Sequence, residues 1–435
     1  DEWAAMGAEG WQWSNVLGYF KRSEGNERGA SELHGGDGPL GVSDPRHRNP
    51  LSEAFLQAAG QAGHALTDDF NGSHQDGFGW YQTTTRDGAR SSSAAAFLAP
   101  VRQRPNLRVV TGATASRVSF EAGRATGVTY TVGRRSYNEG AAREVILSGG
   151  AINSPQLLML SGIGPAAHLA EHGIGVVHAL PGVGENLHDH PDVVMVVDAP
   201  KLTDLFGLSL AGVARMVRGL FEWRRHRSGL LTTNFAEAGG FIKSAPDEAI
   251  PDLQLHFVVG KLVDHGRKTV LGHGYSCHVC LLRPKSRGTL RLASADPQVM
   301  PLIDPAFLKD PDDVSRLVRG FKRMRELMQQ PALARHGGRE SRASALAQSD
   351  AQIEQFVRFH ADTIYHPVGT CRMGPDAGAV VDARLRVHGV AGLRVVDASV
   401  MPGVVGGNTN APVIMMAEKA VDMIREDHSF ESATS

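Results

Sequence analysis

The feature that most constrains the fold is a short apolar strand that runs through a glycine turn into a helix, and it occurs twice. Residues 145–148 precede a pair of glycines and a helical segment at 155–160. Residues 393–402 are typical of a second buried strand that ends in an acid and small residues, and a polar glycine loop and a helix that starts near Pro412 follow it. Strand, glycine turn and helix in this order are typical of an α/β nucleotide-binding unit.

Length and charge narrow the class of protein. A chain of 435 residues suits two domains or one large two-lobed unit. The 45 Lys and Arg residues nearly balance the 46 Asp and Glu residues, so the net charge is −1 and nothing attracts nucleic acid over the whole surface. No apolar run reaches the roughly 18 residues of a membrane-spanning helix. Residues 1–3 lack the basic and apolar regions of a signal peptide. We therefore expect a cytoplasmic protein.

The cysteines give no sign of a disulfide framework or a metal site. Three cysteines in a chain of this length indicate a reducing compartment. Cys277 and Cys280 have the spacing of half a zinc site, but residues 275–282 are predicted to form a strand. Residues three apart in a strand point to opposite faces. The two thiols should therefore diverge, and we predict no bound metal.

Helices and strands are predicted along much of the remaining chain. Asn49 is a good N-cap with Pro50 at the first helical position, and residues 314–328 follow helical spacing. Residues 107–110 and 118–130 are typical of strands. The segment Gly36-Asp37-Gly38-Pro39-Leu40-Gly41 has dinucleotide-binding spacing, but no strand precedes it and it contains a proline. We interpret it as a loop.

Residues 202–223 predict a long amphipathic helix that ends in a basic run at 224–227. A helix of this kind usually packs its apolar face on the core, and that interpretation is favoured here. The same composition would also let it lie on a membrane surface, so a peripheral contact with the inner membrane is the alternative.

Two loops could carry chemistry. His366 precedes Pro367, which disfavours helix at the histidine and places it in extended backbone at a loop or strand end. Conventional hydrolase, metalloprotease and phosphate-loop motifs are absent. The polar glycine loop before Pro412 brings backbone N–H groups and a helix N-terminus to one spot, which either binds an anion or only caps the helix.

The sequence resembles the glucose–methanol–choline (GMC) family of flavin oxidoreductases over essentially its whole length. The block at 181–191 carries His188 where glutamine is usual. Two further blocks, DHGRK and LLRPKSRG, are similar to the bacterial alcohol and choline dehydrogenase branch. The matching blocks are residues 150–164 (GAINSPQLLMLSGIG), 181–191 (PGVGENLHDHP), 264–268 (DHGRK), 281–288 (LLRPKSRG), 366–370 (HPVGT), 396–399 (VDAS) and 408–412 (NTNAP).

The resemblance implies a mixed α/β fold of two domains whose segments alternate along the chain. A Rossmann-like flavin-binding domain is expected at 1–59, 101–195 and 364–435, and a substrate domain built on an antiparallel sheet at 60–100 and 196–363. Family members open with a strand, a GxGxxG turn and an acidic residue about 20 positions later. Residues 1–4 resemble a point after these features. We therefore expect an incomplete FAD-binding domain in which the N-terminal half is missing.

The resemblance also implies the reaction and its residues. The expected substrate is a primary, aliphatic alcohol. Its carbon would pass a hydride to flavin N5, which yields the aldehyde. His366 would be the general base and Asn408 its partner, because a neutral imidazole accepts the hydroxyl proton and an amide holds the alkoxide. Electrons would then pass to oxygen or a quinone. The predicted FAD contacts are Ala115, Asp397, Ala398, Asn408 and Thr409.

The expected gap at the front leaves a second class of function open. FAD binding could be lost in this chain, and His366 could then serve as the base of a flavin-free hydrolase or lyase. A non-catalytic remnant on the same scaffold is a further alternative. Unpaired strand edges invite association, so a homo-oligomer is also expected.

Overall fold

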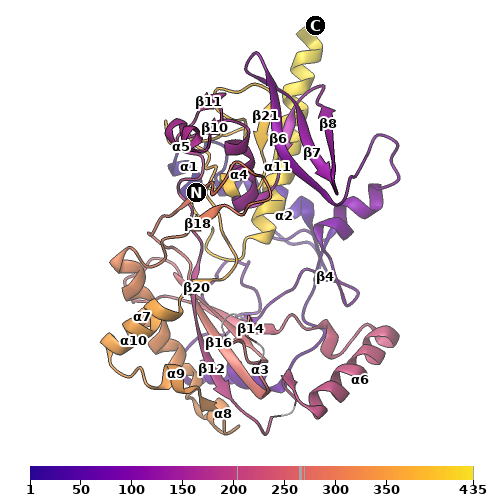
Figure 1. The fold of residues 1–435 in the computed structure, drawn as a ribbon. Helices are drawn as coiled ribbons and strands as arrows, with labels where there is room; N and C mark the ends of the chain where they lie inside the picture. Colours follow the sequence, from indigo (N-terminus) through magenta and orange to yellow (C-terminus); the bar gives the residue numbers. More distant parts are fainter. Residues whose placement is uncertain (203, 264–266, 269, 435) are drawn as a thin grey trace.

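The structure of the chain, a computed structural model, describes residues 1–202, 204–263, 267–268 and 270–434. Three residues of the DHGRK block, Asp264, His265 and Gly266, lie outside the described residues, as does Thr203 of the predicted amphipathic helix. Elements from distant parts of the sequence form an upper and a lower half (Figure 1). Both termini lie in the upper half.

An antiparallel sheet forms the lower half. Its strands pair in the order β19, β12, β16, β15, β14, β3, with β20 added beside β12 and β13 beside β16. The strands span Arg339–Glu340 (β19), Pro191–Asp198 (β12), Gly272–Leu281 (β16), Leu253–Val258 (β15), Ala236–Ile242 (β14), Gly77–Trp80 (β3), Asp362–Thr363 (β20) and Gly207–Leu208 (β13). The predicted antiparallel sheet is therefore present.

The two faces of this sheet differ because its strands alternate apolar and polar residues. In β15, Leu253, Leu255 and Phe257 point into a core with helices α3 (Pro50–Gln61), α7 (Pro311–Met328) and α10 (Asp350–His360). The Asn49 side chain accepts a hydrogen bond from the N–H of Leu51, so the predicted cap is confirmed. The intervening residues, Gln254 and His256, face the other way.

The upper half contains both strand–glycine–helix units. Strands β9 (Val145–Leu147) and β21 (Leu393–Val395) pair in parallel, and helices α4 (Gly150–Leu160) and α11 (Asn410–Thr434) follow them. Beside them lies an antiparallel sheet of β6 (Ala113–Glu121), β7 (Arg124–Val132) and β8 (Arg135–Gly140). Residues 107–110 form no strand, so that prediction was wrong. The mixed α/β fold class is confirmed.

Shorter elements complete the described chain. Residues 36–39 form a loop, as predicted for the 36–41 segment, whereas Leu40 and Gly41 already belong to β2. The remaining helices and strands are α1 (Glu2–Ala5), α2 (Trp13–Ser23), β1 (Glu24–Asn26), β2 (Leu40–Val42), β4 (Thr85–Arg86), β5 (Ala89–Arg90), β10 (Ile163–Gly164), α5 (Ala166–Glu171), β11 (His178–Ala179), β17 (Thr289–Arg291), β18 (Leu302–Asp304), α8 (Pro331–Ala334) and α9 (Arg342–Ala345), with short turns of 3₁₀ or π helix at 94–101, 230–232 and 398–400.

The buried cysteines follow the geometry of their strand. Cys277 packs in the large core beneath the sheet, whereas Cys280 belongs to a small apolar cluster on the opposite face, with Phe70, Phe241 and Leu282. Both lie in β16, as predicted from the sequence. The two thiols therefore point away from each other.

The amphipathic helix departs from the favoured interpretation. It is α6 (Leu210–His226), which begins eight residues later than predicted and projects at the side of the lower half (Figure 1). Its large apolar side chains are exposed except for Trp223, which is half-buried, and its buried residues are Gly212 and Gly219. The core-facing interpretation is wrong because small residues, not the apolar face, contact the rest of the protein.

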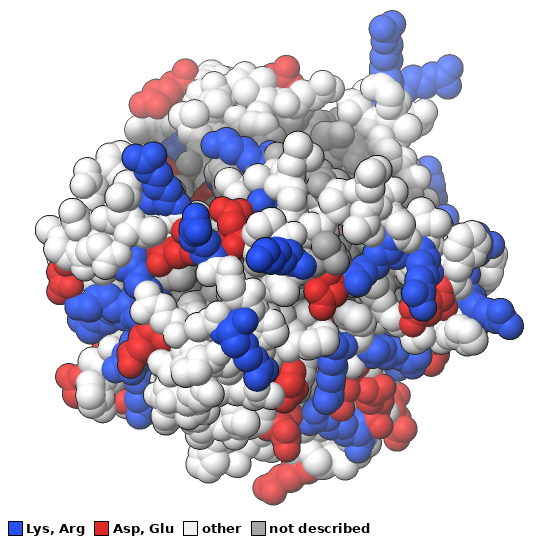
Figure 2. Space-filling model, turned by 90° about the horizontal axis from the view of Figure 1, so that it is seen from below, with Lys and Arg blue, Asp and Glu red and all other residues white. Residues whose placement is uncertain are grey.

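Charge is mixed over the face that Figure 2 shows, where Lys and Arg side chains are interspersed with Asp and Glu. No continuous field of one sign covers this face. This pattern agrees with a net charge of −1.

Candidate functional site

A strained turn, which directly follows β20, carries His366. Tyr365, the residue before it, has φ 69°, a left-handed conformation that is costly for a residue with a side chain. The turn is held because the N–H of Tyr365 donates to the Thr363 hydroxyl and the N–H of His366 donates to the Asp189 carboxylate at 3.0 Å. The Thr363 hydroxyl donates to the same carboxylate. Asp189 therefore fixes the backbone that presents the imidazole.

A second histidine determines which nitrogen of His366 carries the proton. His190 Nε2 lies 3.0 Å from the carbonyl oxygen of Val405, which can only accept, so this nitrogen carries a hydrogen. A neutral His190 then has its lone pair on Nδ1, which lies 3.1 Å from His366 Nδ1. His366 must donate there, and its own lone pair is left on Nε2.

Asn408 faces that lone pair. Its Nδ2 lies 3.3 Å from His366 Nε2. The orientation of its amide follows from Gln254, whose Nε2 donates to Asn408 Oδ1 at 3.2 Å and to the Tyr81 hydroxyl at 3.2 Å. Tyr81 uses its own hydrogen on the carbonyl of Leu255 at 2.7 Å, so it can only accept from Gln254. Asn408 therefore directs its N–H₂ group, not its oxygen, at the imidazole.

Burial keeps both imidazoles neutral. It lowers the pKa of His366 to about 4 and the pKa of His190 well below its ordinary value. The rings meet edge to face, with centroids 5.2 Å apart. At pH 7 the pair is uncharged, and the Nε2 lone pair of His366 is available as a base.

The block at 181–191, which contains His190, also anchors the loop that carries Asn408. His188 accepts from the N–H of Val404 at 2.9 Å and lies 2.6 Å from the carbonyl of Asn186, to which it donates. Burial lowers its pKa to about 3, so it keeps this one-donor, one-acceptor state. Glutamine also offers an N–H donor and a carbonyl acceptor, so either residue could make this pair of hydrogen bonds.

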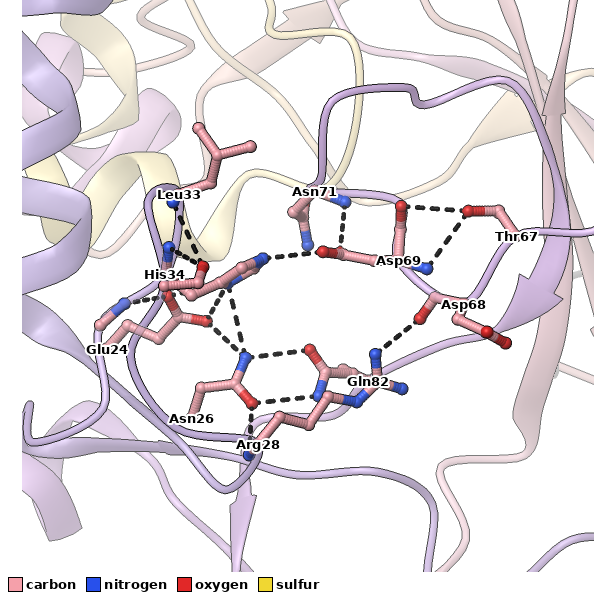
Figure 3. A network of polar contacts seen from close by, with 12 residues as sticks. Glu24, Asn26, Arg28, Leu33, His34, Thr67, Asp68, Asp69, Asn71 and Gln82 are labelled. Carbon is pink, nitrogen blue, oxygen red and sulfur yellow. Dashed lines mark hydrogen bonds and ion pairs between the residues drawn. The ribbon is translucent and has the colours of Figure 1, made fainter.

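A second polar network surrounds His34 (Figure 3). His34 lies between two carboxylates, with Nδ1 2.9 Å from Glu24 and Nε2 2.9 Å from Asp69. Burial lowers its pKa, but the hydrogen bonds and charges of the two carboxylates outweigh burial and raise it above the ordinary value. Six residues after Asp69, Gln75 Nε2 donates to the carbonyl of Gly406 at 2.9 Å. Gln75 therefore links the segment that follows this network to the loop at residue 406.

Polar side chains lie on the sheet face beneath the site, the same face that carries the small apolar cluster around Cys280. His278 Nδ1 lies 2.6 Å from the Asp192 carboxylate, and both are buried. His256 pairs with His278 in the register of β15 and β16 and is buried beside Tyr81. Burial lowers the pKa of His256 to about 3. These side chains form a floor of neutral or paired groups under His366 and Asn408.

Sequence reasoning identified His366 and Asn408, and the structure brings them together. It missed His190, Gln254 and Tyr81, which set the orientation of that pair. The alternation Leu253-Gln254-Leu255-His256-Phe257 was a usable signal, because polar residues on one face of a buried strand need a polar environment. Nothing local in the sequence indicates that His190 reaches His366.

Two of the predicted FAD contacts, Ala115 and Ala398, lie on elements that pack against the same helix, α4. Thr409 and Asn408 precede α11, whose N-terminus concentrates N–H groups and positive charge. Ala398 begins the short helix after β21, and Ala115 is exposed on β6. Helix α4 packs against both of these elements, and the common position of all the predicted contacts around one flavin stays a prediction.

Asp397 makes contacts within the protein. Its carboxylate accepts from the N–H of Gly150 at 2.9 Å, from the Ser154 hydroxyl at 2.5 Å and from the N–H of Ser399 at 2.8 Å. It therefore joins the start of α4 to the turn after β21. Its predicted contact with FAD stays a prediction.

The residues present suit a flavin. A Cβ added to Gly150 would meet nothing within 4 Å, and one added to Gly407 would meet nothing closer than 3.8 Å, so the backbone is open to a planar ring at both glycines. Gly407 lies three residues before α11, and a helix N-terminus suits the electron-rich edge of a reduced flavin.

Comparison with known proteins gives the family. Two GMC oxidoreductase family models match the chain, an N-terminal one at residues 1–192 and a C-terminal one at residues 284–417. An alcohol dehydrogenase [acceptor] of Pseudomonas putida is 48% identical over 97% of this chain and 77% of its own length. The mitochondrial choline dehydrogenase of Mus musculus is 46% identical over 99% of this chain and 72% of its own length.

Solved structures of flavin-dependent and related oxidases also resemble this chain. Pyridoxine 4-oxidase from Mesorbium loti superposes with a TM-score of 0.84 at 28% identity, covering 98% of this chain and 80% of that one. A formate oxidase variant of Aspergillus oryzae, described by its FAD modification, gives a TM-score of 0.89 at 28% identity, covering 99% and 81%. Matches to both family models and to relatives above 40% identity lead to one conclusion: the chain belongs to the GMC oxidoreductase family.

Proposed function

We propose that the protein oxidises a primary, aliphatic alcohol to the aldehyde with FAD as cofactor and His366 as the general base. The observation that carries this proposal is the hydrogen-bond chain from Val405 through His190 to His366. It leaves a lone pair on His366 Nε2, facing Asn408.

The alcohol oxygen would replace the direct contact between His366 and Asn408. Its hydroxyl hydrogen would donate to His366 Nε2, and Asn408 Nδ2 would donate to the oxygen. As the O–H bond breaks, His366 takes the proton, the C=O bond forms, and Asn408 stabilises the charge on oxygen. Bound FAD, held by Asn408, Thr409, Ala398, Ala115 and Asp397, would supply the acceptor for the hydride that leaves the carbon.

The polar surroundings favour a neutral alcohol over choline. The carboxylates that join the network, Asp189 and Asp192, already hold Thr363 and His278. Burial raises the pKa of Asp189 to about 6, so this carboxylate is still mostly ionised at pH 7, and the Thr363 hydroxyl and the N–H of His366 already hold its charge. A quaternary ammonium ion gains most from an accessible carboxylate or an aromatic cage. The similarity to alcohol dehydrogenase [acceptor] supports the same substrate class.

A flavin-free hydrolase or lyase is the second candidate, because a neutral, oriented imidazole could also activate water. The alcohol oxidation depends on FAD and on an electron acceptor, whereas the flavin-free reaction depends on neither. The reduction of an electron-accepting dye is measured with a series of linear primary alcohols and with choline, with and without added FAD. A yellow protein that reduces the dye with alcohols, and loses this in His366→Gln, supports the proposal.

Three outcomes contradict the proposal: no flavin absorbance after FAD addition, turnover without an acceptor, or a rate on choline above that on every alcohol. The rate in air compared with the rate under argon with a soluble quinone distinguishes oxygen from quinone as acceptor.

A further inference from the structure

Helix α6 presents its apolar side to solvent. The exposed fractions are 93% for Leu210, 56% for Val213, 52% for Val217 and 69% for Phe221. These residues recur at spacings of three and four, which places them in one stripe along the helix. Single exposed apolar residues are ordinary, but a continuous stripe on one helix marks an interaction surface.

The helix is firmly held in this orientation. The Ser209 hydroxyl caps it by accepting from the N–H of Gly212 at 3.0 Å, and lies 2.6 Å from His273 on β16. Near the other end, the Trp223 indole donates to the carbonyl of Gly88 at 2.7 Å. Anchors at both ends prevent the helix from turning its apolar stripe inward.

An exposed residue of the neighbouring sheet lies beside the start of the helix. Leu208 pairs with Gly272 in the register of β13 and β16, and Leu271 precedes Gly272 with an exposed fraction of 77%. Leu271 therefore lies near Leu210 and lengthens the apolar surface. None of the helices in the described residues is both long and apolar enough to cross a bilayer.

The charge beside the stripe identifies the partner. Residues 210–227 contain five arginines and a single glutamate, a charge of +4 in a chain whose net charge is −1. Arg218 and Arg225 are exposed on the flank of the stripe, and Arg224 is exposed near its end. Two copies of this helix packed face to face would bring like charges together. An anionic lipid surface complements both the apolar stripe and the arginines.

We propose that α6 docks the protein on an anionic phospholipid membrane. Leu210, Val217 and Phe221 insert at the level of the headgroups while the arginines bind lipid phosphates. The helix lies in the plane of the membrane and does not cross it. This inference rests on the exposed face alone and is independent of the proposed reaction.

The test is co-sedimentation of the full chain with vesicles of equal parts phosphatidylglycerol and phosphatidylcholine, and with vesicles of phosphatidylcholine alone. We expect binding to the anionic vesicles, at least tenfold weaker binding to the neutral ones, and a marked loss at 0.5 M salt. Leu210→Ser combined with Phe221→Ser should weaken binding at least tenfold. Phe359→Ser is the matched control, because Phe359 is 77% exposed on α10 and should leave binding unchanged.

Arg218→Glu combined with Arg225→Glu tests the charges separately and should also abolish binding to anionic vesicles. Three results would overturn the proposal. One is a wild-type chain that stays in the supernatant with anionic vesicles. Another is a Leu210/Phe221 variant that binds as the wild type does. The third is a dimer in sedimentation velocity that this variant dissociates, which would assign the face to a second copy.

Discussion

Two histidine networks support the same loop, and they hold their imidazoles in opposite states. His34 lies between Glu24 and Asp69, which raise its pKa, so that it can carry a charge. His366 contacts the uncharged groups of His190 and Asn408, and burial lowers its pKa to about 4. The hydrogen-bond partners of each ring therefore determine whether it serves as a charged structural link or as a neutral base.

The comparison also explains how distant segments cooperate. The charged network bonds residues 67–71, and Gln75, four residues further on, holds Gly406. The neutral network holds Val404 and Val405 through His188 and His190. Both converge on the loop that ends at Asn408. The following changes test this division from the largest expected effect to the smallest.

His366→Gln removes the base from the neutral network. We expect kcat/KM for a primary alcohol to fall by about 10²- to 10⁴-fold, with the melting temperature nearly unchanged because glutamine can still donate to His190. Steady-state dye reduction measures kcat/KM, and thermal unfolding measures the melting temperature. An unchanged rate would show that proton transfer uses another group.

His190→Phe removes the acceptor that fixes the tautomer of His366. We expect kcat/KM to fall by about 10- to 100-fold, as for the loss of a group that orients a reacting one. The pH–rate profile should change as well, because His366 is then free to carry its hydrogen on either nitrogen. His190→Gln, which keeps one donor and one acceptor, should recover part of the rate. Equal losses in both variants would indicate a purely structural role.

Gln254→Leu frees the amide of Asn408 to rotate. One hydrogen bond is worth about 1 kcal/mol, so we expect kcat to fall roughly fivefold with little change in KM. Gln254 lies on the sheet face away from the main core, so the substitution should not unfold the protein. A rise in KM with constant kcat would show that Gln254 contacts the substrate instead of positioning Asn408.

His34→Gln tests the charged network and should have the smallest effect. Because the folded pKa of His34 is raised, its contribution to stability is complete below the unfolded value of about 6.5 and is lost as pH rises through the folded value. The melting temperature of the wild type should exceed that of the variant by at most about 2 °C at pH 6, and the difference should shrink by pH 9. A difference that grows with pH would contradict a charged His34.

Much of the fold could be predicted because it follows from local patterns. The strands at β9 and β21, the Asn49 cap and the divergence of Cys277 and Cys280 all depend on neighbouring residues. The division into domains stays a prediction, as do the roles of Ala115, Asp397, Ala398 and Thr409. Helix α6 was misjudged because its composition does not reveal which face meets the protein.

The site was only half predictable from the sequence. His366 and Asn408 came from family resemblance, whereas the partners that set their chemistry are non-local. His190 reaches His366 across 176 residues, and Gln254 reaches Asn408 across 154. Such contacts depend on the register of β12 against β20 and β16, which no local pattern specifies.

The most direct test of the account is the protonation state of His366. Long-range ¹H–¹⁵N correlation spectra of histidine-labelled protein, with the resonance assigned by its loss in His366→Gln, report the hydrogen on each ring nitrogen without requiring turnover. The account predicts a hydrogen on Nδ1, a bare Nε2 at pH 7, and no protonation of the ring until the pH approaches about 4. A hydrogen on Nε2 at pH 7, or a titration midpoint at or above 6.5, would contradict it.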